Sequence, residues 1–108
     1  VRNRIWKREF TDNSLKVTVI TSEQVNKCAE LVVIPNSVEE ISENAFAQCE
    51  KLKKVFFVPG SKLQKLGNSC FSNSGLKTIM IPQTVKEIDD CAFTNCGRLR
   101  TVFFEYEC

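Results

Sequence analysis

The segment that decides the fold reads IPNSVEEI at residues 34–41 and returns as IPQTVKEI at residues 81–88. Both copies continue in the same way, so that each residue of the second lies 47 positions after its counterpart. The matched residues beyond the quoted segments are Ala45, Phe46, Cys49 and Leu52 in the first copy, and Ala92, Phe93, Cys96 and Leu99 in the second. Repetition at a fixed period indicates a repeat protein, in which one structural unit stacks on the next.

A third copy lies between these two and divides the period into units of about 23 or 24 residues, a length typical of leucine-rich repeats. Its apolar residues are Leu63, Leu66, Cys70, Phe71 and Leu76. It has one extra residue before Leu63 and lacks one before Leu76. A weaker copy comes first, where residues 5–10 resemble residues 66–71. Residues 21–27 are too few for a full unit, which predicts a truncated turn.

Each unit begins with a short alternating run, in which residues such as Val55 and Phe57 are two positions apart. That spacing is the period of a strand with one buried face. No unit can bury its apolar side alone, so the units are expected to stack. We therefore expect parallel strands, with rungs about 4.8 Å apart, at residues 17–20, 31–34, 54–57, 78–81 and 101–104.

The second part of each unit has a different spacing. Ile41, Ala45 and Cys49 are four positions apart, which favours a short helical turn. Ser42, and Asp89 in the later copy, are the expected N-caps of these turns. The predicted fold is therefore a leucine-rich-repeat solenoid, with short parallel β-strands on one face and turns and short helical turns on the other.

The chain is expected to form a single repeat domain over residues 1–108. It divides into a degenerate N-terminal unit at about residues 1–30 and repeats at about residues 31–53, 54–77 and 78–104. The sequence stops soon after the last strand, although solenoids need polar caps on their terminal rungs. We therefore expect a longer repeat array, or a partner that covers the last rung.

The pattern Ile-Pro-x-Ser/Thr-Val-x-Glu-Ile, followed by Ala-Phe-x-x-Cys-x-x-Leu, resembles the BspA-like leucine-rich repeat family. The resemblance covers residues 31–104 closely and residues 5–20 weakly. It implies a repetitive surface protein of the kind found in host-associated bacteria and in trichomonad and amoebic parasites. It also implies a non-catalytic protein-binding module at the cell surface or outside the cell, which takes part in adhesion to a host matrix or cell-surface protein.

An intracellular function is the alternative. The chain has six cysteines but no Asn-x-Ser/Thr glycosylation site, and the repeat accounts for some of these cysteines as small buried hydrophobes. Both observations suit a cytoplasmic scaffold, in which the same surface docks against a neighbouring subunit of a larger assembly. A third hypothesis is binding of an anionic glycan.

Several function classes lack any sequence support. The chain has no histidine, the commonest general base, and no motif for phosphate, zinc or acyl chemistry. We therefore expect no enzyme activity and no cofactor or metal. The net charge of +2 is too small to indicate nucleic acid. No apolar stretch is long enough to insert into a membrane.

The repeat geometry restricts disulfide pairing. Cys49 and Cys96 share a column but lie two rungs apart, about 9–10 Å, which is too far for a bond. Cys70 and Cys91 lie in neighbouring rungs, and they are the one pair that the geometry allows easily. The repeat gives no position for the remaining two cysteines, Cys28 and Cys108.

Two exposed columns are candidate partner-binding surfaces. The strand residue between the two core positions points outward, which predicts an apolar strip of Val33, Phe56, Met80 and Phe103, with Val19 as a fifth member. The alternative is that these large side chains only stabilise the sheet. A basic column contains Lys16, Lys53, Lys77 and Arg100. The opposite side is expected to be acidic, with Glu39, Glu40, Glu43, Glu87, Asp89 and Asp90. Ordinary solvated charge is the alternative for both.

Overall fold

The computed structural model describes residues 5–7 and 17–105 of the chain. Within these residues every regular element is a strand, and there is no helix long and apolar enough to cross a bilayer. The main sheet contains β1 (Ile5–Lys7), β3 (Leu31–Ile34), β5 (Lys54–Phe57), β7 (Thr78–Ile81) and β9 (Thr101–Phe104). The small sheet contains β2 (Val19–Ile20), β4 (Glu40–Ile41), β6 (Lys65–Leu66) and β8 (Glu87–Ile88).

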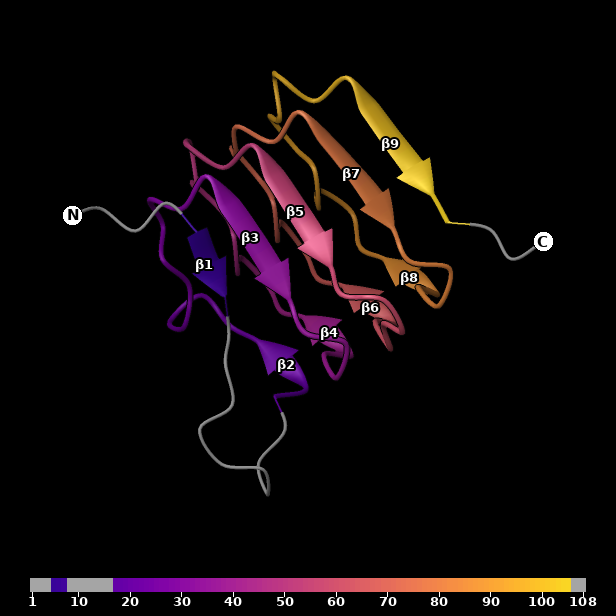
Figure 1. Cartoon of the computed structure of the whole chain (residues 1–108). Coiled ribbons are helices and arrows are strands. Elements are labelled where there is room, and N and C mark those ends of the chain that lie inside the picture. Colours follow the sequence, from indigo (N-terminus) through magenta and orange to yellow (C-terminus); the bar gives the residue numbers. More distant parts are fainter. Residues whose placement is uncertain (1–4, 8–16, 106–108) are drawn as a thin grey trace.

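The chain winds as a solenoid in which successive turns add one strand to each sheet (Figure 1). All neighbouring strands are parallel, and Val33 of β3 lies opposite Phe56 of β5. The parallel repeat and four of the expected strands, at residues 31–34, 54–57, 78–81 and 101–104, are confirmed. Each repeat therefore contributes one strand to the main sheet, at the position that the apolar alternation predicts.

The strand expected at residues 17–20 is shorter than predicted and does not belong to the main sheet. Val19 and Ile20 form β2 of the small sheet, where they lie opposite Glu40 and Ile41. Thr18 and Val19 are both exposed, so this segment lacks the alternation of a main-sheet strand. The first strand of the main sheet is β1, which the resemblance of residues 5–10 to residues 66–71 had assigned to the other part of the unit. Val19 is therefore not a member of the apolar strip.

The helical turns are also wrong, and the hydrogen bonds show why. Asn44 and Gln48 have left-handed φ angles of 60° and 66°, which a helix does not allow. The amide of Ala45 bonds to the carbonyl of Ser42, but that of Phe46 donates to Cys70 in the next rung. Alternate amides thus go to the neighbouring rung instead of closing a helix. The same turns recur in the other rungs, so the expected N-caps at Ser42 and Asp89 have no helix to cap.

The core lies between the two sheets and consists of columns of like residues. Phe46 and Phe71 stack with their ring centroids 5.3 Å apart, and Phe71 and Phe93 with theirs 5.6 Å apart. Trp6 of β1 packs edge-on against Phe46 at 6.0 Å. Since the rings are nearly parallel, at 6° and 5°, each rung presents the same apolar shape to the next.

The Ser/Thr position of the repeat motif joins the rungs. The Ser37 hydroxyl donates to the carbonyl of Val17 at 2.7 Å, and the Thr84 hydroxyl donates to the carbonyl of Leu63 at 2.6 Å. In both cases the acceptor belongs to the preceding rung. Val17 and Leu63 each lie two residues before a strand of the small sheet, β2 and β6, so the hydroxyl gives their carbonyls a partner outside the sheet ladder.

The two ends of the stack differ. At the first rung, the Lys27 ammonium donates to the carbonyls of Ala45 and Ala47 at 3.1 and 3.3 Å. Their counterparts in the next rung, Cys70 and Ser72, accept backbone amides instead, so Lys27 replaces the amides that the short segment at residues 21–27 does not supply. At the last rung, several side chains that continue the core columns are exposed, namely Ile88, Val102 and Phe104.

Candidate functional site

The predicted apolar strip lies on the outer face of the main sheet. The exposed fractions are 46% for Phe56, 54% for Met80 and 51% for Phe103, and Val33 is half-buried. The register places Val33 opposite Phe56, and Met80 opposite Phe103. The inward neighbours Val55 and Ile79 are 4% and 2% exposed. The alternation thus sends every second side chain of β5 and β7 out of the core.

One side of the strip is bordered by a mostly polar row of residues. Leu31, Lys54, Thr78 and Thr101 share one register row, directly before the strip in each strand's direction. Lys54 and Thr101 are exposed, whereas Leu31 and Thr78 are half-buried. The strip is therefore an apolar band with a mostly polar row along one side, and an apolar centre beside polar residues is typical of many protein interfaces.

Three of the four residues of the predicted basic column are described, and they occupy consecutive rungs. The amide of Lys77 bonds to the carbonyl of Lys53 at 3.3 Å, and the amide of Arg100 bonds to that of Lys77 at 3.0 Å. All three side chains are exposed. The Lys53 ammonium pairs with Glu30 at 3.5 Å. Lys16 lies outside the described residues.

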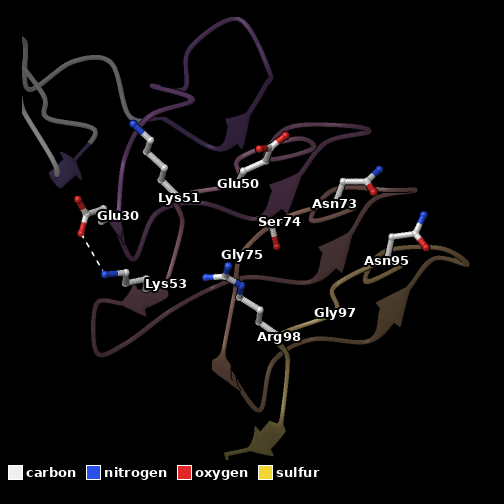
Figure 2. Close-up of a pocket in the computed structure, with 10 residues that line it drawn as sticks. All are labelled: Glu30, Glu50, Lys51, Lys53, Asn73, Ser74, Gly75, Asn95, Gly97 and Arg98. Atoms are coloured by element: carbon white, nitrogen blue, oxygen red, sulfur yellow. Dashed lines mark ion pairs between the residues drawn. The ribbon is translucent and has the colours of Figure 1, made fainter.

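A hollow at this corner of the solenoid adds two cations that the sequence pattern did not single out, Lys51 and Arg98. It has a volume of about 580 Å³, and Figure 2 shows the residues that line it. A second hollow of about 500 Å³, lined by Lys77, Gly97, Arg98 and Arg100, adjoins it through Gly97 and Arg98. We call the two hollows together the corner groove.

The corner groove exists because the middle rung turns the corner with one residue fewer. Six positions separate Phe46 from Leu52, and six separate Phe93 from Leu99, but only five separate Phe71 from Leu76. Gly75 therefore passes close to the preceding rung, where a Cβ would overlap the carbonyl oxygen of Glu50. Residues from the longer corners on either side, such as Lys51 and Arg98, line the hollow around it.

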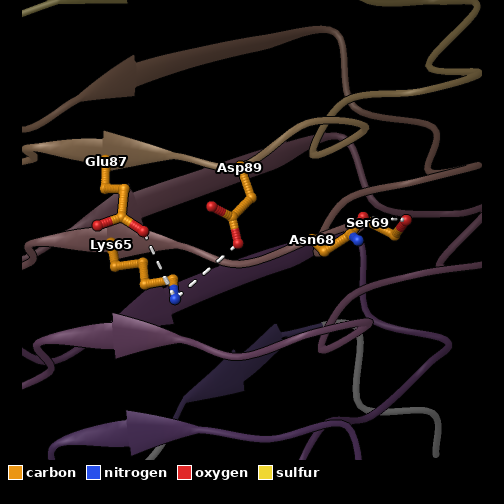
Figure 3. A network of polar contacts seen from close by, with 5 residues as sticks. All are labelled: Lys65, Asn68, Ser69, Glu87 and Asp89. Atoms are coloured by element: carbon orange, nitrogen blue, oxygen red, sulfur yellow. Dashed lines mark hydrogen bonds and ion pairs between the residues drawn. The ribbon is translucent and has the colours of Figure 1, made fainter.

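The side with the small sheet was expected to be acidic, and the structure places cations among the carboxylates. The Lys65 ammonium lies 3.6 Å from a Glu87 carboxylate oxygen and 3.9 Å from one of Asp89, as Figure 3 shows. Lys86 lines a hollow together with Glu39 and Glu40. Charge on this side is therefore mixed.

None of the five described cysteines forms a disulfide. Cys70 is buried and Cys91 is exposed, so the pair that the repeat geometry allowed is unbonded. Burial raises the pKa of the Cys70 thiol to about 12. It also raises the pKa of Cys49, although the nearby Lys27 acts in the opposite direction. Cys70 and Cys49 are therefore protonated at neutral pH and serve as small core side chains. Cys108 lies outside the described residues.

The described residues hold no cluster of three or more Cys, Asp or Glu side chains that could bind a metal ion. The features that remain as candidate sites are two surfaces, the apolar strip and the corner groove. The strip takes one side chain from the same position in successive rungs, and the groove combines such a column, Lys53, Lys77 and Arg100, with the shorter corner of the middle rung. A surface of this kind suits an extended ligand that contacts several rungs at once.

Solved structures with the same architecture are bacterial. The pneumococcal vaccine antigen PcpA superimposes with a TM-score of 0.82 at 21% identity, over 94% of this chain and 28% of that one. A leucine-rich cell surface protein from Faecalibacterium prausnitzii superimposes with a TM-score of 0.63 at 22% identity, over 97% of this chain and 36% of that one. The T. pallidum leucine-rich repeat protein TpLRR superimposes with a TM-score of 0.62 at 25% identity, over 92% of this chain and 57% of that one.

The chain thus spans between 28% and 57% of the length of these three structures. No curated protein sequence matches it at a significant level. The profile of the BspA-type leucine-rich repeat region matches residues 18–108 in six copies, which agrees with the resemblance seen in the repeat motif. The chain therefore belongs to the BspA-type leucine-rich repeat family.

Proposed function

We propose that this chain is a non-catalytic protein-binding module whose partner lies across the apolar strip of Val33, Phe56, Met80 and Phe103. The observation that carries the proposal is the exposure of two phenylalanines and a methionine in one row on the main sheet. A contiguous apolar row of this kind is typical of interaction surfaces. Aromatic and Met side chains are also the types enriched at the centres of protein interfaces.

The family supports the same function in general terms. Leucine-rich repeats are in general protein-interaction modules, and the partner commonly contacts several successive repeats. One of the similar structures is named a cell surface protein and another a vaccine antigen. We therefore propose that the chain acts at the cell surface in adhesion, with a host matrix or cell-surface protein as its partner.

The test of the strip is saturable binding of the fluorescently labelled chain to a deposited layer of mammalian extracellular matrix. The double variant Phe56→Ser/Phe103→Ser is expected to bind at least about tenfold more weakly, since burying each ring contributes about 1.5–3 kcal/mol. Its folding is checked separately by thermal unfolding. A large loss of stability without any partner would mean that the two rings belong to the core.

Phe104→Ser is the matched control. It makes the same chemical change at a residue that is 52% exposed, on the same strand β9 as Phe103, but on its opposite face. This variant is expected to bind the matrix layer as the unchanged chain does. Full-affinity binding by the folded double variant would show that the strip only stabilises the sheet.

An intracellular scaffold is the second candidate, and the unpaired cysteines favour it. Five described thiols without a disulfide suit a reducing compartment. Labelling intact cells of the source organism with a membrane-impermeant amine reagent separates the two locations. Labelling of the chain supports the surface function, whereas labelling only after the cells are lysed supports the scaffold.

A further inference from the structure

The corner groove concentrates positive charge that the fold leaves unpaired. Its cations come from three successive rungs and are Lys51, Lys53, Lys77, Arg98 and Arg100. Of these, Lys53 pairs with Glu30 at 3.5 Å. The other four form no ion pair with any carboxylate in residues 5–7 and 17–105. By contrast, Lys65 on the small-sheet side is shared by two carboxylates.

The hollow has polar groups beside these charges. Asn73, Ser74 and Asn95 line it together with Gly75 and Gly97. Figure 2 shows the Arg98 side chain extending toward the middle of this set, while the Glu50 carboxylate lies on the far side of the set from Arg98. Ser74 is buried and its hydroxyl bonds to Cys96 and Leu76, but Asn73 and Asn95 are exposed. Asparagine amides both donate and accept hydrogen bonds, so the groove offers partners for hydroxyl groups as well as for anions.

We infer that the corner groove binds a linear anionic polysaccharide that runs across the rungs. Lys53, Lys77 and Arg100 repeat at the rung spacing, so they match a polymer that carries a sulfate or carboxylate on successive sugars. Arg98 and Arg100 provide planar guanidinium groups suited to two-point contact with such oxyanions. The exposed asparagines, Asn73 and Asn95, contact sugar hydroxyls. This site is separate from the apolar strip and does not depend on the function proposed for it.

A nucleic acid is the competing polyanion, and the groove lacks what it needs. Proteins that bind single strands stack the bases on aromatic side chains, and no aromatic residue lines either hollow. The carboxylates of Glu30 and Glu50 also lie among the lining residues. A continuous phosphate backbone approaches such acidic groups unfavourably, whereas a polysaccharide with spaced charges and many hydroxyls can avoid them.

The first test measures binding of a fluorescent heparin oligosaccharide by anisotropy at low ionic strength. The double variant Arg98→Gln/Arg100→Gln is expected to bind about tenfold more weakly. Lys62→Gln/Lys86→Gln is the matched control, because it removes the same net charge at exposed residues that line a different hollow. Its affinity is expected to stay within about twofold of the original.

The second test fills the groove without changing any charge. A Cβ at Gly97 has no heavy atom within 4 Å, and Gly97 lines both hollows. Gly97→Trp is therefore expected to fold and to bind heparin at least about tenfold more weakly, while Gly97→Ala binds normally. Phe56→Ser/Phe103→Ser, which alters the apolar strip, is expected to leave heparin binding unchanged.

Several results would overturn the inference. These are no binding of heparin, equal losses in the two charge-removing double variants, full binding by Gly97→Trp, and tighter binding of a single-stranded oligonucleotide than of heparin. Neutral dextran of the same length is expected not to bind, and binding equal to that of heparin would exclude the cations as the recognition element. Binding is also expected to weaken as salt is added, because the contacts are exposed ion pairs.

Discussion

At the scale of single residues, the fold depends on positions where one rung touches the next. The core columns contain like residues in successive rungs, so a change at one position alters the contacts of two neighbours. The polar residues that join rungs, Ser37 and Thr84, act through their hydroxyls on the preceding rung. The Ser/Thr position of the motif thus requires a hydroxyl that hydrogen-bonds to a carbonyl of the preceding rung.

Gly75 is expected to be the least replaceable glycine of the chain. A Cβ there would overlap the Glu50 carbonyl oxygen and lie 2.9 Å from that of Leu52. Both obstacles are backbone atoms, which cannot move without shifting the preceding rung. Gly75→Ala is therefore expected to lower the free energy of unfolding in urea by roughly 1–3 kcal/mol.

Gly97→Ala serves as the control in the next rung, since no atom lies near its added methyl group. Its effect is expected to stay within about 0.5 kcal/mol, as for most exposed substitutions. Equal effects of the two substitutions would mean that the middle rung does not approach the preceding one as closely as the structure shows.

At the scale of elements, the sequence predicted what depends on period and missed what depends on backbone bonding. The strands at residues 31–34, 54–57, 78–81 and 101–104 follow from the alternation of apolar residues, and so does the outward direction of Phe56. The four-residue spacing of Ile41, Ala45 and Cys49 suits a helix equally well as a chain of turns. What decides between them is that Phe46 and its counterparts give their amides to the next rung, a contact that spacing along one chain segment does not reveal.

The candidate surfaces divide in the same way. The strip was readable because strand side chains alternate, and the basic column because it recurs in each repeat. The corner groove could not be predicted from the sequence, although the residue missing before Leu76 is visible there. The effect of this missing residue depends on how the rungs stack, because the shorter corner forms a hollow only between two longer ones. Val19 was wrongly assigned to the strip, because its strand β2 pairs with β4 in the small sheet and not with the main sheet.

The truncated first unit leads to a prediction about Lys27. The Lys27 ammonium group donates hydrogen bonds to the carbonyls of Ala45 and Ala47, whereas backbone amides donate to the equivalent carbonyls in the other rungs. Lys27→Met keeps an unbranched side chain one atom shorter and removes the donor. We expect a loss of roughly 1 kcal/mol of stability, because these bonds are partly exposed and water can replace them in part.

Lys62→Met is the comparison for this variant, since the Lys62 side chain is exposed and makes no hydrogen bond or ion pair in the described residues. Both proteins are unfolded in urea and the midpoints compared. If the two substitutions have the same effect, the first rung is stabilised by packing alone, and Lys27 does not replace the missing amides.

At the scale of the whole molecule, burial of the core columns differs between the first full rung and the last. Trp6 and Lys27 cover the first full rung, whereas the last rung exposes Val102, Phe104 and Ile88 at 36%, 52% and 41%. Burial in a solenoid comes from the neighbouring rung. Stability should therefore depend on a residue's rung as well as on its type.

Val55 and Val102 test this dependence, because they occupy the same column in β5 and β9 and are 4% and 36% exposed. Val→Thr changes the polarity of each side chain without changing its size. At Val55 the new hydroxyl lies in the core and is expected to cost about 1–3 kcal/mol in urea unfolding. At Val102 water reaches the hydroxyl, so the cost is expected to stay below about 1 kcal/mol. Should Val102→Thr cost as much as Val55→Thr, the last rung must be covered in the folded protein in solution. Repeating the measurement at a tenfold lower protein concentration then shows whether a second copy covers it, because stability conferred by association falls on dilution.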